Sequence, residues 1–190
     1  MRKSSDTKSR IVSAAWKLFY QQGYDNTTIE DIIEEAHVSK GSFYHYFDSK
    51  DNLPASLGYL FDEKYQELSE TMDPSMNPID KLIFMNHELF LMIENTVSVD
   101  LLSRLFSSQL ISTERSLLDN NRTYYKMLRQ ITIEAQQQNL FRPEFTTNDI
   151  TRAYAMFERG LMYDWCLSSA SYSLTHNAGQ MFPAFLKTFC

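Results

Sequence analysis

The segment that decides the fold runs from Thr27 to Lys50 and reads TTIEDIIEEAHVSKGSFYHYFDSK. Thr27 and Glu30 have the spacing of a capping box, in which the Thr27 side chain accepts a hydrogen bond from the Glu30 amide and the Glu30 carboxylate reaches back. Two short apolar stripes follow, separated by residues 36–38 (AHV). A connection of that length allows only a sharp reversal, and two short helices around such a turn are typical of a helix-turn-helix unit.

A further helix is expected before this segment, because apolar residues there recur with the period of one helix face. Gly23 is its expected C-terminal stop. After the segment, Ser49 or Asp51 is expected to open a longer helix, and Pro54 is expected to delay its start or to bend it. The apolar face of the first helix consists of Ile11, Ala14, Ala15, Leu18 and Phe19.

The remainder of the chain also has the pattern of helices, and strand signals are nearly absent. Asn77 as N-cap and Pro78 at the first helical position restart a helix after a break. The apolar periodicity predicts helices over 78–94, 98–113, 116–138, 147–169 and 174–188. The sequence therefore predicts an all-α protein of about nine helices.

The composition is that of a globular protein, with 43% hydrophobic and 22% charged residues among 190. The net charge is −6, but residues 1–50 are neutral overall, and residues 1–24 hold five basic side chains against one acid. This asymmetry predicts an N-terminal end that meets an anion. Only two cysteines, no signal-peptide core and no membrane-spanning segment favour a reducing, cytoplasmic setting with no membrane partner.

The expected second helix of the helix-turn-helix unit has a start that suits DNA. Its first residues are small, so the backbone can enter a major groove about 12 Å wide, and Lys40 is long enough to reach a base edge or a phosphate. Phe43 and Phe47 are four residues apart on its buried side. Tyr44 and His45 are then expected on the opposite side, where DNA is accessible.

Residues 10–53 resemble the DNA-binding domain of the TetR family of bacterial transcriptional regulators, over about a quarter of the chain. The resemblance implies a three-helix helix-turn-helix DNA-binding domain over residues 1–50 and a helical ligand-binding and dimerisation domain over residues 51–190. The matching residues are Arg10-Ile11, Ala14-Ala15, Leu18-Phe19, Gly23-Tyr24, Thr27-Thr28-Ile29, Asp31-Ile32, Ala36, Val38-Ser39-Lys40-Gly41-Ser42-Phe43-Tyr44, Tyr46-Phe47, Ser49-Lys50 and Leu53.

By the same resemblance, eight positions are expected to contact DNA. Phosphate contacts are assigned mainly to Thr28, Tyr44, Tyr46 and Lys50, and base contacts to Lys40, Gly41, Ser42 and His45. Phosphate contacts fix the register on the duplex and base contacts carry the sequence information. Two alternatives stay open: Tyr46 could pack against the helix that follows, and the basic tail Arg2–Lys8 could be disordered or could reach a flanking minor groove.

The region after residue 78 holds most of the aromatic residues, which either fill a core or line an apolar pocket with a few polar anchors. An acidic, aromatic-rich core favours a lipophilic or cationic effector. The candidate ligand contacts are His87, Glu88, Arg104, Tyr124, Tyr125, Phe157 and Asp164, with Arg159 as a further polar candidate.

In the family, the last two helices pair across a two-fold axis, which implies a homodimer with a self-complementary interface. Pro183 lies inside the last of these expected helices. The candidate interface residues are Tyr154, Phe157, Leu161, Trp165, Phe182, Phe185, Leu186 and Phe189.

The resemblance implies a repressor that binds a pseudo-palindromic DNA operator as a dimer and is released by a small-molecule inducer. The alternatives are an activator or ligand-independent regulator, or a helical partner-binding protein with a vestigial helix-turn-helix. No phosphate-binding glycine loop, nucleophile elbow or His-Glu-x-x-His occurs, so no enzyme, catalytic residue or cofactor is predicted. A metal sensor using His87, Glu88, His176 or Cys166 is a weaker alternative, and no metal site is predicted.

Overall fold

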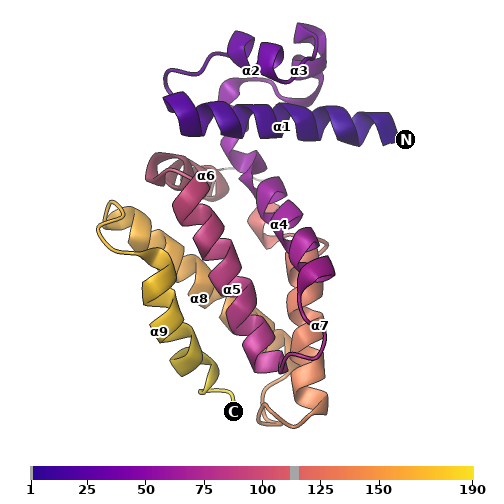
Figure 1. Ribbon diagram of the computed structural model, residues 1–190, viewed down its shortest axis with the longest axis vertical. Coiled ribbons are helices and arrows are strands. Elements are labelled where there is room, and N and C mark those ends of the chain that lie inside the picture. The colour runs from indigo at the N-terminus through magenta and orange to yellow at the C-terminus, as the bar shows by residue number, and fades with distance from the viewer. Residues whose placement is uncertain (1, 112–115) are drawn as a thin grey trace. The chain divides into compact units, whose positions relative to one another are not determined.

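A computed structural model describes residues 2–111 and 116–190, and within these ranges it contains nine α-helices and no strand (Figure 1). The chain divides into two compact units. The first comprises residues up to Leu60 together with Asp100–Leu117, and the second comprises Phe61–Val99 together with Leu118–Cys190. The sequence-based domain boundary at residue 50 stays a prediction.

The first unit contains α1 (Arg2–Gln22), α2 (Ile29–Glu35), α3 (Lys40–Tyr46) and α6 (Val99–Ile111). Helix α1 packs against both α2 and α3. Since α1 begins at Arg2, the basic tail is a continuation of this helix. The buried apolar side chains of the first three helices include Ile11, Ala15, Phe19, Ile32, Ala36, Phe43 and Phe47.

The turn between α2 and α3 is a tight, hydrogen-bonded reversal. His37 has φ +52°, and the Val38 amide donates to the Ile33 carbonyl at 3.1 Å. This pattern satisfies the free carbonyls at the end of α2. The Arg10 guanidinium of α1 adds hydrogen bonds to the carbonyls of Ala36 and His37. A basic residue counted above toward the positive N-terminal end therefore holds the turn in place.

Helix α2 begins one residue later than predicted. The N-cap is Thr28, whose side chain accepts from the Asp31 amide at 3.1 Å while the Asp31 carboxylate accepts from the Thr28 amide at 2.8 Å. The predicted capping box of Thr27 with Glu30 is wrong, because Thr27 is buried and its hydroxyl donates back to the Gly23 carbonyl. Two adjacent threonines made the register ambiguous. By contrast, the predicted cap Asn77 of α5 is confirmed, and Ser39 caps α3.

Pro54 delays the fourth helix. Two 3-10 turns, Lys50–Asn52 and Pro54–Ser56, precede α4 (Leu57–Thr71). The prediction that Ser49 or Asp51 opens the long helix is therefore wrong. A proline at position 54 has no amide hydrogen to donate to residue 50, so a continuous helix from Ser49 would lose a backbone bond there.

The second unit contains the rest of α4, α5 (Pro78–Thr96), α7 (Thr123–Gln137), α8 (Thr147–Leu167) and α9 (Leu174–Leu186). Helix α5 packs against α7 and α9, and α8 packs against the same two helices, so the four surround one core (Figure 1). Pro183 lies inside α9, which continues past it to Leu186.

One predicted helix of this unit is divided. The segment expected as a helix over 116–138 forms a 3-10 turn at Ser116–Leu118 and then α7 from Thr123. Between them the Asp119 carboxylate accepts from the amide of Asn121 at 2.9 Å. Such a local side-chain bond competes with the helical backbone bonds, and the periodicity of apolar residues did not reveal it.

In the described part of the chain, no helix is long and apolar enough to cross a membrane. Nor do three or more His, Cys, Asp or Glu side chains of those residues gather where they could hold a metal ion.

Candidate functional site

The outer face of α3 is the first candidate site. Lys40, Gly41, Tyr44 and His45 are exposed, and Tyr44 retains 46% of its surface, while Phe43 on the opposite side is fully buried. Of the other residues predicted to contact DNA, Thr28 is exposed at the start of α2, and Ser42 and Tyr46 are half-buried. The helix can therefore present a polar and aromatic surface to a groove while two phenylalanines anchor it to its own domain.

Lys40 lies in a weak ion pair. Its Nζ is 2.8 Å from Glu30 Oε1, and both side chains are more than 60% exposed. The hydrogen bond from Lys40 lowers the pKa of Glu30, and the same bond raises the pKa of Lys40. Exposed pairs of this kind are weak because solvent and salt screen the two charges. A phosphate can therefore compete for Lys40 at little cost.

Lys50 is directed into the first unit. Its Nζ donates to the carbonyls of Tyr24 at 2.8 Å and Thr27 at 2.9 Å, and it lies 4.4 Å from the centre of the Tyr24 ring. An ammonium group has three N–H bonds. Two of them are used here, so one N–H bond of Lys50 remains to donate to a phosphate. The phosphate contact assigned to Lys50 stays a prediction.

Tyr24 is the centre of a polar cluster in the first unit. Its hydroxyl donates to Asp51 at 2.6 Å, and burial and this bond raise its pKa. The Arg104 guanidinium of α6 lies 4.2 Å from the same ring and forms ion pairs with Asp25 at 3.1 Å and Asp100 at 2.9 Å. Arg104 thus belongs to the helix-turn-helix unit, whereas the other residues predicted to bind a ligand belong to the second unit.

Most of the remaining candidate ligand residues have local partners. The Glu88 carboxylate lies 3.4 Å from Lys64 and 3.3 Å from its neighbour His87. Asp164 accepts from the Tyr172 hydroxyl at 2.8 Å, and burial and this bond raise the pKa of Tyr172 to about 12. Phe157 stacks on Phe185, Arg159 donates to Tyr125 at 3.2 Å, and the adjacent rings of Tyr124 and Tyr125 are 4.8 Å apart. The structure therefore brings together His87 with Glu88, and Tyr124 with Tyr125 and Arg159, but not the whole set.

The core of the second unit holds a polar cluster that the sequence analysis missed. Glu158 of α8 is only 4% exposed and accepts a hydrogen bond from Asn86 of α5 at 3.1 Å. Burial raises the pKa of Glu158, and the bonds from its neighbours offset this only in part. Glu158 follows Tyr154 by four residues and precedes Leu161 by three, so it lies on the apolar stripe of its helix. A glutamate at an apolar position of this helix was the signal in the sequence that could have indicated a buried polar cluster.

One hydroxyl group next to this cluster, that of Tyr65, is buried without a hydrogen-bond partner among the described residues. The Tyr65 ring lies 5.0 Å from that of Tyr124, whose hydroxyl interacts with Glu158, and burial strongly raises the pKa of both tyrosines. The hydroxyl of Tyr154, by contrast, donates to the Leu82 carbonyl at 2.8 Å. Buried polar groups in native proteins are nearly always paired, so an orphan hydroxyl beside a buried carboxyl marks a place where a ligand group can bond.

Most residues predicted at the dimer interface pack inside the subunit. Phe157 and Phe185 are half-buried, and the ring of Tyr154 lies 5.0 Å from Phe182 within the seam of α8 and α9. Six of the eight are less than a tenth exposed, namely Tyr154, Leu161, Trp165, Phe182, Leu186 and Phe189. Their role in a dimer stays a prediction. The exposed apolar residues of α8 are instead Met156, Tyr163 and Leu167.

Comparison with known proteins agrees with the geometry of α1 to α3. Residues 11–57 match the model of the family described as bacterial regulatory proteins, tetR family. The chain is 40% identical over 78 residues to the HTH-type transcriptional regulator HbdR of Aromatoleum sp. (strain CIB), which covers 40% of this chain and 34% of HbdR. It is 31% identical over 101 residues to the HTH-type transcriptional regulator TtgR of Pseudomonas putida, covering 53% and 47%.

The first curated relatives are matched over only about a fifth to a third of their own length. Solved structures extend the likeness in fold to nearly the whole chain. The transcriptional regulator FadR of Bacillus subtilis, solved with stearoyl-CoA, is 16% identical, with a TM-score of 0.70 over 94% of this chain and 97% of that one. Residues 11–57 therefore carry the helix-turn-helix domain of the tetR family of bacterial regulatory proteins, and nearly the whole chain shares the all-helical fold of FadR.

Proposed function

We propose that this chain is a ligand-responsive transcriptional regulator that binds a pseudo-palindromic operator as a homodimer in the cytoplasm and is released by a small-molecule inducer. The observation that carries the proposal is the exposed polar face of α3, with Lys40, Gly41, Tyr44 and His45 accessible and Phe43 buried behind them. A recognition helix needs this combination of a fixed inner face and a free outer face.

The test of DNA binding is a gel-shift series on the upstream region of the protein's own gene. The double variant Lys40→Ala, Tyr44→Ala is expected to weaken binding at least tenfold, because it removes a charged and an aromatic contact from one face. Tyr20→Ala is the matched control, since Tyr20 is 59% exposed but lies on α1. An unchanged affinity of the double variant, with a correct helical circular-dichroism spectrum, would contradict the assignment of α3.

The proposed dimer uses the outer face of α8 and α9. Met156, Tyr163 and Leu167 are 56%, 51% and 68% exposed at helical spacing, and a side chain added at Gly160 would meet nothing within 4 Å. Apolar residues repeated on one exposed face mark an interaction site. Leu167→Glu is expected to convert the dimer into a monomer in sedimentation analysis and to abolish operator binding. A protein that sediments as a monomer before mutation would rule the dimer out.

The proposed effector site lies in the second unit. The core of that unit contains the buried Glu158 and, beside it, the Tyr65 hydroxyl, which has no hydrogen-bond partner among the described residues. Two structures similar in fold were solved with small molecules, B. subtilis FadR with stearoyl-CoA and RolR with resorcinol. A ligand shifts the affinity for DNA only if it binds one state of the protein better than the other. Reporter expression in a deletion strain distinguishes a repressor from an activator. Loss of a repressor raises expression, whereas loss of an activator lowers it.

A further inference from the structure

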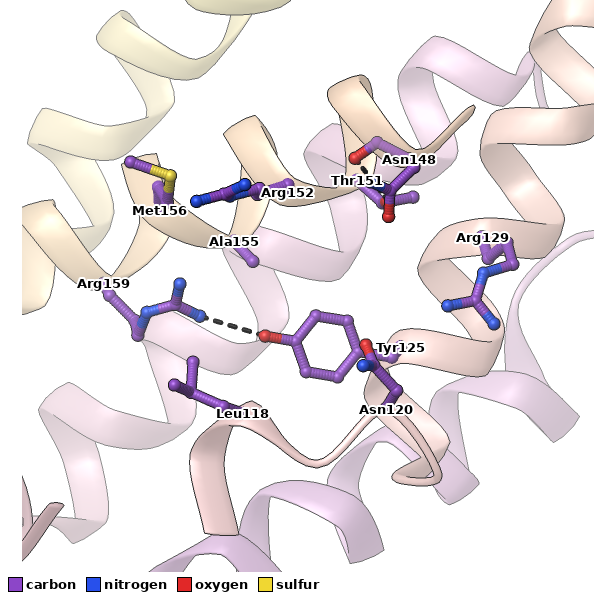
Figure 2. A pocket seen from close by; sticks show the side chains of 10 residues that line it. All are labelled: Leu118, Asn120, Tyr125, Arg129, Asn148, Thr151, Arg152, Ala155, Met156 and Arg159. Atoms are coloured by element: carbon purple, nitrogen blue, oxygen red, sulfur yellow. Dashed lines mark hydrogen bonds between the residues drawn. The ribbon is translucent and has the colours of Figure 1, made fainter. Parts of the chain in front are cut away.

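Helices α7 and α8 enclose a pocket of about 420 Å³ together with the turn at Leu118 (Figure 2). Its size is within the range of pockets that hold small molecules, about 300–1,000 Å³. The pocket lies wholly in the second unit. Of the residues that line it, only Tyr125 and Arg159 were predicted from the sequence as ligand contacts.

The charge of the pocket is one-sided. Arg129 of α7 and Arg152 and Arg159 of α8 line it, and no Asp or Glu does. Among the described residues, none of these arginines lies within ion-pair distance of a carboxylate. Arginine side chains around one pocket attract an oxyanion, because a guanidinium matches the geometry of carboxylate and phosphate. Figure 2 shows Arg152 and Arg159 on one side of Tyr125 and Arg129 on the other.

Two carboxyl groups interact electrostatically with these arginines. Hydrogen bonds from the hydroxyl and the amide of Thr146, at 2.6 and 2.9 Å, lower the pKa of Asp149, and the charge of Arg152 adds a smaller effect. Glu158 is buried in the core, where burial raises its pKa above the usual value and so favours its neutral form. Asp149 therefore offsets part of the charge of Arg152, but neither carboxylate forms an ion pair with an arginine of the pocket among the described residues.

The pocket also has a fixed donor and apolar walls. Arg159 Nη1 donates to the Tyr125 hydroxyl at 3.2 Å, which holds that guanidinium in position, and Figure 2 shows Arg129 beyond the other end of the tyrosine ring. Leu118 and Ala155 supply apolar surface beside these polar groups, and Met156, which also belongs to the proposed dimer face, lines the pocket as well. A charged head with an apolar body fits such a lining.

We propose that this α7–α8 pocket binds an anionic amphiphile through a carboxylate or phosphate head group held by Arg152 and Arg159, with Arg129 adding positive charge on the opposite side of Tyr125. As a statement about the effector, this rests on the proposed regulatory function, and it replaces the cationic class favoured by composition. The net charge of the whole chain concealed the site, because the three positive charges lie within a domain that is acidic overall.

The test uses isothermal titration calorimetry on the full chain with octanoate, octyl phosphate and octylamine. Octanoate or octyl phosphate is expected to bind, and the tighter of the two identifies the head group. The double variant Arg152→Gln, Arg159→Gln is expected to lose at least tenfold in affinity for that anion. Lys126→Gln is the control, because Lys126 is an exposed cation of α7 outside this pocket. Circular dichroism checks that the variants fold.

Octylamine binding as tightly as the anions would overturn the proposal, as would full affinity in the double arginine variant. A parallel gel shift separates the two hypotheses. If the chain binds its operator but no octyl anion, the pocket assignment fails and the regulatory function stands. If arginine-dependent anion binding occurs but no operator is bound at low salt, the pocket stands and the regulatory function fails. Where both occur, the anion is expected to weaken operator binding, and an unchanged affinity would refute its role as effector.

Discussion

Single hydroxyl groups distinguish the polar core of the second unit from an ordinary helical core. Tyr65 and Tyr154 are both at most 2% exposed, yet only the Tyr154 hydroxyl has a partner, the Leu82 carbonyl. A buried polar group without a partner costs about 1–3 kcal/mol, whereas a made hydrogen bond contributes about 1 kcal/mol. The Tyr65 hydroxyl therefore lowers the stability of the folded protein, whereas the Tyr154 hydroxyl raises it.

This contrast gives a matched pair of substitutions. Tyr65→Phe is expected to raise the free energy of unfolding by about 1 kcal/mol, because it removes an unsatisfied hydroxyl. Tyr154→Phe is expected to lower it by a similar amount, because the Leu82 carbonyl loses a donor. Urea denaturation of both variants measures the difference. If both substitutions destabilise equally, the Tyr65 hydroxyl is bonded in solution.

Glu158 gives a pH dependence with a definite sign. Its pKa in the folded state is raised, so the stability it contributes is complete below its usual pKa of about 4.5 and is lost as the pH rises through the folded value. Glu158→Gln removes the charge that must be desolvated and is expected to be more stable than the wild type at pH 8 by about 1 kcal/mol or more. Near pH 4 the advantage is expected to disappear. A constant difference between the two proteins across this range would contradict the assignment.

For single residues, the sequence predicted which side chains are buried or exposed better than it predicted their hydrogen-bond partners. The outward Tyr44 and inward Phe43 follow from helical periodicity alone, and the structure has both. The inward direction of Lys50 does not, because its acceptors are the carbonyls of Tyr24 and Thr27, more than twenty residues away. No pattern of side-chain types encodes the position of a backbone carbonyl.

The turn between α2 and α3 is the element whose conformation matters most for the DNA-binding face. His37 has φ +52°, in the left-handed region that favours glycine. His37→Gly is therefore expected to stabilise the protein by up to about 1 kcal/mol in thermal unfolding, and His37→Val to destabilise it by more, because a β-branched residue is strained there. Equal effects of the two substitutions would show that the turn relaxes. His37 is exposed, so changes in packing do not obscure the comparison.

The number of elements was more predictable than their ends. Apolar periodicity located α5, α8 and α9 to within about two residues, because each carries a continuous buried stripe. It failed at the start of α7, where Asp119 makes a local turn, and at the start of α4, where Pro54 interrupts the backbone bonds. Both failures arise from single residues that act on the backbone and leave the apolar pattern unchanged.

For the molecule as a whole, charge near the α3 face is expected to govern affinity for DNA. Operator affinity should fall steeply with salt, because each phosphate that is neutralised releases counterions. Glu30→Gln is expected to strengthen operator binding up to about fivefold, since it frees Lys40 and removes a negative charge. Glu67→Gln, which removes the exposed carboxylate that pairs with the half-buried Lys64 on α4, is the control. Equal effects of the two variants in fluorescence anisotropy would argue against contact at Lys40.

The division into units was the least predictable feature at this scale. Composition and resemblance placed a boundary near residue 50, but α6 joins the first unit from about fifty residues farther along the chain. The join is made by the pairing of Arg104 with Asp25 and Tyr24, which are distant in sequence. Arg104 is a charged side chain of the kind that can anchor a ligand. Only its position in the structure assigns it to the helix-turn-helix unit.

The membership of α6 in that unit has a practical consequence for protein production. A fragment that ends at residue 60 would lack Arg104, the partner of Tyr24 and Asp25. Expressed alone, residues 1–60 are therefore expected to form a less stable domain. A shortened helix-turn-helix unit would need residues 100–111, added as a separate peptide or joined by a linker, before its stability could be compared with that of the full chain.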